Sequence, residues 1–184
     1  MILKNNASLA PFAPKEQRMS ELTSRHLEAF QRFLELLPHG KEPEVVLLKG
    51  HLLIEEQIRA LIDHRLRNPK TLRGANVKIG CHLAISLARA FFPPGHMDNI
   101  WEAVFKLNQL RNSIAHGFMD KQSLTDQIEA WVQNTQTGAR ELKNTTERLE
   151  FTLWAIFEAV SSFVDDSGTW GFDSKSYGER ESVT

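Results

Sequence analysis

The sequence contains one cysteine, Cys81, among its 184 residues. A single thiol cannot form an internal disulfide, and it cannot build a zinc site from several cysteines. Because disulfides are typical of secreted proteins, their absence makes the cytoplasm the expected location. We interpret Cys81 as a small buried apolar residue rather than a nucleophile.

Several other features are missing. Residues 1–14 carry one basic residue, Lys4, and no long apolar run, so they resemble neither a signal peptide nor a membrane anchor. No later stretch reaches the roughly 18 apolar residues that a membrane-spanning helix needs. The sequence also lacks a glycine-rich phosphate loop, a nucleophile elbow and a histidine pair spaced for a zinc-binding helix. We therefore expect no membrane association, no cofactor and no bound metal.

The overall charge is balanced, since the sequence has 22 Lys and Arg residues and 23 Asp and Glu residues. Any binding of nucleic acid must therefore be local. The strongest asymmetry lies between His64 and Met97, where no acidic residue occurs. One interpretation is a solvated linker, and the other is an RNA-binding strip that contacts phosphates. Both require exposure, but only the second predicts a steep salt dependence. The residues assigned to this basic strip are Arg65, Arg67, Lys70 and Arg73.

Apolar residues recur at spacings of three and four, the pattern of amphipathic helices, and no segment alternates like a strand. We predict an all-α bundle of five to six helices, mainly antiparallel because short loops join antiparallel neighbours. Residues 1–14 are predicted to be a loosely ordered lead-in, 15–166 a single helical domain and 167–184 a flexible tail. The predicted helices cover about 15–37, 45–66, 77–92, 101–117, 123–137 and 139–166, and Asp98 is a candidate cap for the fourth.

The fourth predicted helix carries the side chains that are best suited to catalysis or anion binding. Arg111 lies four residues after Leu107 and so continues the apolar stripe of this helix. A guanidinium stays protonated and is costly to bury alone, so it requires a carboxylate, a bound phosphate or a second subunit. Asn112 and His116 are four residues apart and share a helix face. Three hydrogen-bonding side chains therefore meet near one helix end.

The segment Arg111-Asn112-Ser113-Ile114-Ala115-His116 resembles the signature of the HEPN superfamily. That signature is an arginine followed after four to six residues by a histidine, often with an asparagine directly after the arginine. Three other pairs have the bare spacing, but two contain prolines and the third has no asparagine after its arginine. These pairs are Arg32 with His39, Arg59 with His64 and Arg89 with His96.

The resemblance implies an HEPN-like fold and a metal-independent endoribonuclease that cleaves RNA through attack of the 2′-hydroxyl. In that case Arg111 holds the phosphate, His116 transfers protons and Asn112 orients either side chain. It also implies a homodimer whose paired motifs line one cleft, and a role as a toxin or defence effector with an antitoxin or regulatory partner. Some such toxins are adenylated on a tyrosine two residues after the histidine. Phe118 occupies that position, so this modification cannot occur there.

Glu55 precedes Arg59 by four residues on the second predicted helix. It either forms an intrahelical ion pair with Arg59 or orients Arg111 or His116 as a catalytic carboxylate. Some HEPN proteins are similar in carrying an acidic residue on this helix. We include Glu55 among the candidate catalytic residues.

A different class of function also fits these residues. The chain is similar to the mannitol operon repressor family, which implies a non-catalytic HEPN-like binding or transcription-regulatory protein. In that case Arg111 and His116 form a buried polar network that ties helices together. Cleavage of RNA by the purified protein distinguishes the two classes.

Overall fold

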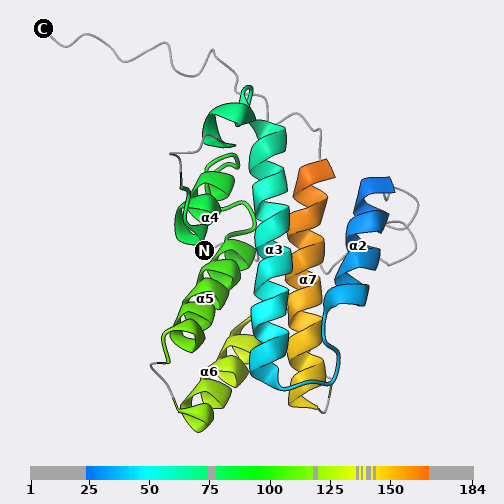
Figure 1. Ribbon diagram of the computed structural model, residues 1–184, viewed down its shortest axis with the longest axis vertical. Helices are drawn as coiled ribbons and strands as arrows, with labels where there is room; N and C mark the ends of the chain where they lie inside the picture. Colours follow the sequence, from blue (N-terminus) through cyan, green and yellow to red (C-terminus); the bar gives the residue numbers. More distant parts are fainter. Residues whose placement is uncertain are drawn as a thin grey trace, which may run out of the picture.

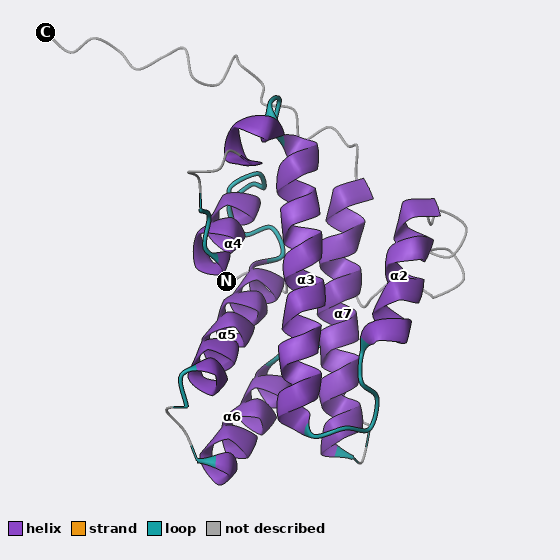
Figure 2. Cartoon of the chain, viewed as in Figure 1, coloured by secondary structure: helices purple, strands orange, loops and turns teal. Residues whose placement is uncertain are grey.

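The structure is a computed structural model that describes residues 24–73, 78–117, 120–135, 137, 139, 142 and 144–165. Within these ranges the chain is helical and contains no strand, which confirms the predicted all-α bundle (Figure 2). None of the described helices is both long and apolar enough to cross a bilayer. The predicted lead-in and tail lie outside the described residues. The elements are α2 (Ser24–Leu36), α3 (Pro43–Arg65), the 3₁₀ helix η2 (Pro69–Arg73), α4 (Cys81–Arg89), α5 (Asp98–Ala115), α6 (Lys121–Asn134) and α7 (Thr145–Asp165).

Helices α3 and α7 form the centre of the bundle and run parallel to each other (Figure 1). Gly50 packs against Leu153 in the first half of both helices, and Gln57 approaches Ser161 in the second half of both. Helices α2 and α5 run in the opposite direction beside this pair. The antiparallel arrangement therefore holds for α2 and α5 but not for the central pair. The 3₁₀ helix η2 and three α-helices separate α3 from α7 in sequence, so no short loop fixes their relative direction.

Local signals explain where the helices begin. Pro43 occupies the first turn of α3, where its missing N–H costs nothing. Asp120 caps α6 by accepting a hydrogen bond from the Ser123 backbone N–H at 3.0 Å. Asp98 is the first residue of α5 and not its cap, and its carboxylate accepts a hydrogen bond from Arg89 at 2.6 Å. The residue before α5 is Met97, whose φ of 53° is left-handed.

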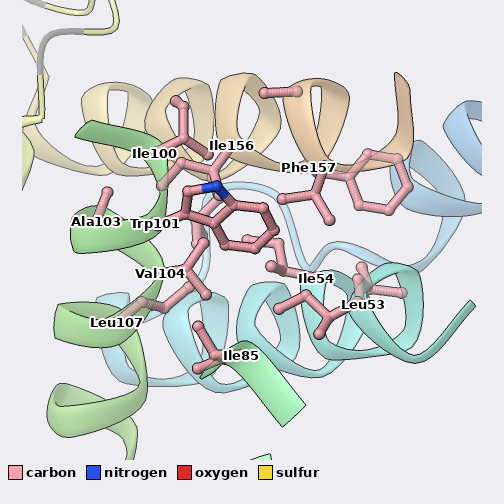
Figure 3. Packing of buried hydrophobic residues seen from close by; sticks show 14 of the residues in the cluster. Leu53, Ile54, Ile85, Ile100, Trp101, Ala103, Val104, Leu107, Ile156 and Phe157 are labelled. Atoms are coloured by element: carbon pink, nitrogen blue, oxygen red, sulfur yellow. The ribbon is translucent and has the colours of Figure 1, made fainter. Parts of the chain in front are cut away.

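Trp101 lies at the centre of the hydrophobic core and is fully buried. Figure 3 shows its indole between Ile156 and Phe157 on α7 and Ile54 on α3. One α5 side chain thus contacts both central helices. An aromatic side chain of this size is a major contributor to core stability. The packing fixes α5, and therefore Arg111, against α3.

Leu52 follows Leu48 by four residues and Leu83 precedes Leu87 by four, a spacing that predicts inward-facing leucines, yet Leu52 and Leu83 lie at the surface. Leu52 on α3 is 53% exposed and Leu83 on α4 is 57% exposed. Helix α3 contacts neighbours on several sides, so its apolar residues do not define a single inward face. On α4 the residues that face the core are the small Ala84 and Ala88 together with Ile85. The four-residue spacing of these alanines is the correct guide to this contact.

A polar network that the sequence does not reveal ties α2 to the central pair. Arg25 donates hydrogen bonds to Gln57 Oε1 at 3.1 Å and to the Ser161 carbonyl at 2.9 Å. Gln57 and Ser161 are buried, so each needs these partners. The network holds α2 in place at the level where α3 and α7 pack.

Candidate functional site

Arg111 and Asn112 lie side by side near the C-terminal end of α5. Both side chains are half-buried, and Arg111 Nη1 donates a hydrogen bond to Asn112 Oδ1 at 3.1 Å. His116 follows as the C-terminal cap of α5 and is exposed. Gly117 ends the helix with a φ of 62°. A half-buried guanidinium and an exposed imidazole therefore lie within about one and a half helical turns.

The sequence requires Arg111 to have a counter-charge. Among the residues that the structure describes, no carboxylate lies within ion-pair distance of its guanidinium. The described ranges therefore contain no carboxylate that pairs with Arg111.

Four side chains from three helices form a polar group beside Arg111, which we call the His51 cluster: His51 and Glu55 on α3, Cys81 on α4 and Asn108 on α5. His51 Nε2 lies 3.2 Å from Asn108 Oδ1 and 3.5 Å from Cys81 Sγ. His51 Nδ1 lies 3.9 Å from Glu55 Oε2. Arg111 follows Asn108 by three residues on α5, and its positive charge acts to lower the pKa of both His51 and Cys81, against larger effects of burial and Glu55.

Burial determines the protonation state of His51. Desolvation lowers the pKa of this histidine, and the nearby charge of Glu55 opposes that effect without reversing it. The imidazole is therefore neutral at neutral pH. A buried, neutral and hydrogen-bonded ring suits a positioning or ligand role better than exchange of protons with a substrate.

The Cys81 thiol is not a nucleophile in this environment. Burial raises its pKa to about 12, with further increases from the charge and hydrogen bonding of Glu55. The reactive form of cysteine is the thiolate, which is scarce at neutral pH when the pKa is so high. The side chain is half-buried, and it contacts polar groups and not only the apolar core.

Glu55 binds Arg59, as the ion-pair interpretation requires. Arg59 Nε donates to Glu55 Oε1 at 2.9 Å, and Arg59 Nη2 also donates to the Ile79 carbonyl at 3.0 Å. Within the described residues, Glu55 makes no direct bond to Arg111 or His116. Glu55 is thus linked to the helix of Arg111 by way of His51 and Asn108, and it does not contact Arg111 itself.

The basic strip begins at the C-terminal end of α3 and continues through η2 (Figure 1), whereas Arg111 lies near His51 on the first half of that helix. Arg65 is half-buried, with its guanidinium 5.9 Å from the ring centroid of Phe92 and its Nη2 3.4 Å from the Phe163 carbonyl. Arg67 and Lys70 are exposed. The side chain of Arg73 lies outside the described residues. Arg65 therefore has a structural role in packing against Phe92 and α7.

A shallow groove of about 480 Å³ follows the outer face of α3 from Leu52 to Asp63. Its lining includes the carboxylates of Glu55, Glu56 and Asp63, with Arg59 as the basic member. Carboxylates repel phosphates, so this groove is a poor path for an RNA backbone. RNA that reaches both Arg111 and the basic strip must avoid it.

Comparison of the chain with protein-family models, with curated proteins and with solved structures gives no match. The helical bundle is therefore established by its own geometry, and the HEPN resemblance remains a prediction from the hexapeptide.

His51 and Asn108 were not among the predicted site residues, although their spacing in the sequence indicates their position. His51 precedes Glu55 by four residues, and Asn108 precedes Arg111 by three. Those spacings place each pair on one helix face. Polar side chains repeated at such spacings beside a predicted site are therefore worth including in it.

Proposed function

We propose that the protein is a metal-independent endoribonuclease of the HEPN type. The observation that carries this proposal is a half-buried Arg111, without a carboxylate partner in the described chain, five residues before the exposed His116 at the same end of α5. Burial without a counter-charge favours binding of an anion, and exposure gives the imidazole access to a substrate. A buried structural network would instead place His116 inside the bundle.

The RNA supplies its own nucleophile in this reaction. His116 removes the proton from a 2′-hydroxyl, and the resulting oxygen attacks the adjacent phosphorus. Arg111 binds the non-bridging oxygens and stabilises the negative charge of the phosphorane. Asn112 fixes the guanidinium through its hydrogen bond. The bond to the 5′-oxygen breaks, that oxygen takes a proton, and the products are a 2′,3′-cyclic phosphate and a 5′-hydroxyl.

Two proton transfers require either one histidine acting twice or a second histidine. His51 is an unsuitable second group because it is buried and hydrogen-bonded to Asn108. We therefore propose a homodimer that brings two copies of His116 to one cleft. The exposed Leu52 and Leu83, on the packed helices α3 and α4, offer apolar surface for such a contact. Light scattering at tens of micromolar protein tests this proposal, and a monomer would remove the second histidine.

A non-catalytic binding or regulatory protein is the second candidate. It is favoured by the hydrogen bond between His51 Nε2 and Asn108 Oδ1, which helps fix the second half of α5 against α3. In that case Arg111→Ala lowers stability and there is no activity to lose. Under the first proposal, the protein is a cytoplasmic toxin or defence effector that is controlled by an antitoxin or regulatory protein.

The experiment that tests the proposed function is incubation of purified protein with mixed RNA substrates in the presence of EDTA. Cleavage that ends in 2′,3′-cyclic phosphates and requires His116 supports it. Intact RNA under all conditions contradicts it.

A further inference from the structure

The side chains of His51, Glu55 and Cys81 converge between α3 and α4. They offer one nitrogen, one oxygen and one sulfur atom, and these three atoms lie within 4.8 Å of one another. We propose that these residues form a binding site for a zinc-class divalent cation that joins α3 to α4.

The ligand set suits such an ion. Zn²⁺ binds imidazole nitrogen, thiolate sulfur and carboxylate oxygen, commonly in a tetrahedral arrangement. His51 and Glu55 lie four residues apart and present their ligands from one face of α3. Cys81 is the first residue of α4 and supplies the third ligand. Three protein ligands leave the fourth position to water.

Bonds to residues outside the proposed site occupy one nitrogen of His51 and one oxygen of Glu55. Asn108 Oδ1 accepts from His51 Nε2, which makes Nδ1 the unprotonated nitrogen. Arg59 binds Glu55 Oε1, and Oε2 is the oxygen that lies 3.9 Å from His51 Nδ1. Such outer contacts fix the ligands of metal sites in the same way.

His51 Nδ1 is the observation that points most directly to a bound ion. His51 is only 3% exposed, and its Nδ1 has no hydrogen-bond partner among the described residues. Buried polar atoms normally have a partner, so an orphan atom calls for an explanation. A cation between Nδ1, Glu55 and Cys81 supplies the missing partner.

Charge also balances at this site. The carboxylate of Glu55 and the thiolate of Cys81 together neutralise a divalent cation, while the imidazole stays neutral. The thiol proton leaves to solvent as the sulfur–metal bond forms. The nearby guanidinium of Arg59 keeps its own bond to the other oxygen of Glu55.

The ion has a structural role in this proposal and takes no part in RNA cleavage. It crosslinks the start of α4 to the middle of α3, on the side of the bundle where Arg111 lies. The inference is therefore independent of the proposed ribonuclease activity.

The test is a titration of the full metal-free chain with Co²⁺, followed by absorption spectroscopy. Cobalt bound to a thiolate shows a charge-transfer band, and tetrahedral cobalt shows intense visible bands. The chain has one cysteine, so any thiolate band arises from Cys81. We expect one Co²⁺ per chain, loss of the bands on addition of Zn²⁺, and a rise in melting temperature with Zn²⁺.

Variants separate this site from other histidine-containing surfaces. Cys81→Ala should remove the charge-transfer band, and Glu55→Gln should weaken Co²⁺ binding at least tenfold while circular dichroism shows a folded protein. His82→Ala is the matched control, because His82 is the exposed neighbour of Cys81 and should leave the titration unchanged. The proposal is overturned by the absence of a thiolate band at millimolar Co²⁺, by undiminished binding in Glu55→Gln, or by one cobalt shared between two chains.

Discussion

Arg111 Nη1 and Asn112 Oδ1 are joined by a hydrogen bond of 3.1 Å between adjacent residues of α5. The amide oxygen orients the guanidinium without neutralising its charge. A carboxylate at the same position would orient it equally well but would also compete with phosphate. The difference between an amide and a carboxylate at residue 112 is therefore a direct probe of anion binding.

We predict that Asn112→Asp impairs RNA cleavage more strongly than Asn112→Ala. The aspartate would form an ion pair with the Arg111 guanidinium and compete with phosphate for it. Alanine would only remove the hydrogen bond that orients the guanidinium. Misplacement alone is expected to cost on the order of 10²-fold in kcat/KM. Steady-state cleavage of one RNA by both variants checks the order. Equal activity of Asn112→Asp and the wild-type protein would contradict a role of Arg111 in phosphate binding.

The basic strip should supply affinity and not chemistry. Neutralising Arg67, Lys70 and Arg73 together should weaken RNA binding and reduce the salt slope on single strands by roughly 0.7 for each phosphate that is no longer neutralised. Cleavage at saturating RNA should be nearly unchanged. Arg65 is left intact because its contacts with Phe92 and α7 would confound binding with stability.

A control variant with the same change in net charge completes that experiment. It neutralises Arg32, Lys41 and Lys121, which are exposed and lie outside the basic strip. Binding titrations at several salt concentrations compare the two triple variants with wild type. If both lower the slope equally, the strip has no special role and is a solvated linker.

Gly50 permits the close contact of the central helices, and Gly50→Ala should be destabilising. A methyl group at this position would lie 2.6 Å from Cδ1 and 2.8 Å from Cδ2 of Leu153, which is fully buried. Overpacking of this kind costs about 1–3 kcal/mol in the free energy of unfolding. Urea unfolding of both single variants and the double variant with Leu153→Ala should show a favourable coupling. Simple additivity would mean that the two positions do not compete for space.

His39 should titrate above its ordinary pKa of 6.5. The hydrogen bond of its Nδ1 to Glu150 at 2.8 Å is the largest cause of the raised pKa, and Nε2 faces the Leu34 carbonyl at 3.1 Å. Protonated His39 thus stabilises the folded state fully below pH 6.5. That stabilisation is lost as pH rises through the folded pKa.

The effect on stability is small because this is an exposed ion pair, for which roughly 0.2–1 kcal/mol is typical. An NMR titration of the His39 ring gives its pKa in wild type and in Glu150→Gln. We expect the variant to titrate lower than wild type. A His39 pKa at or below 6.5 in the wild-type protein would contradict the predicted interaction.

Sequence periodicity was sufficient for the helical bundle and for the position of Arg111, because the buried residues of α5 recur at spacings of three and four along one side of the helix. It failed for Leu52 because α3 packs against neighbours on several sides. It also failed for the parallel direction of α3 and α7, which depends on contacts between segments far apart in the chain. Periodicity predicts the buried face of a helix only when that helix packs against neighbours on one side.

The candidate site could be predicted only in part. The residues of the hexapeptide are local, so their spacing on one helix was visible. The approach of Cys81 to His51 joins two helices and depends on how α4 packs against α3, which no local pattern specifies. For the same reason, the ion pair between Glu55 and Arg59 was predictable, whereas the proximity of Glu55 to His51 and Cys81 as one cluster was not.

The most direct test of the proposed function is RNA cleavage in EDTA by wild type and His116→Ala. Two controls use exposed members of the other arginine–histidine pairs, His64→Ala and Arg32→Ala, and both should cleave like wild type. General acid–base catalysis typically contributes about 10²–10⁴-fold, so His116→Ala should lose at least on the order of 10²-fold while remaining folded. We predict wild-type cleavage that yields 2′,3′-cyclic phosphate ends and loss of that cleavage in His116→Ala. Intact RNA with the wild-type protein, or equal cleavage by His116→Ala, would contradict the proposal.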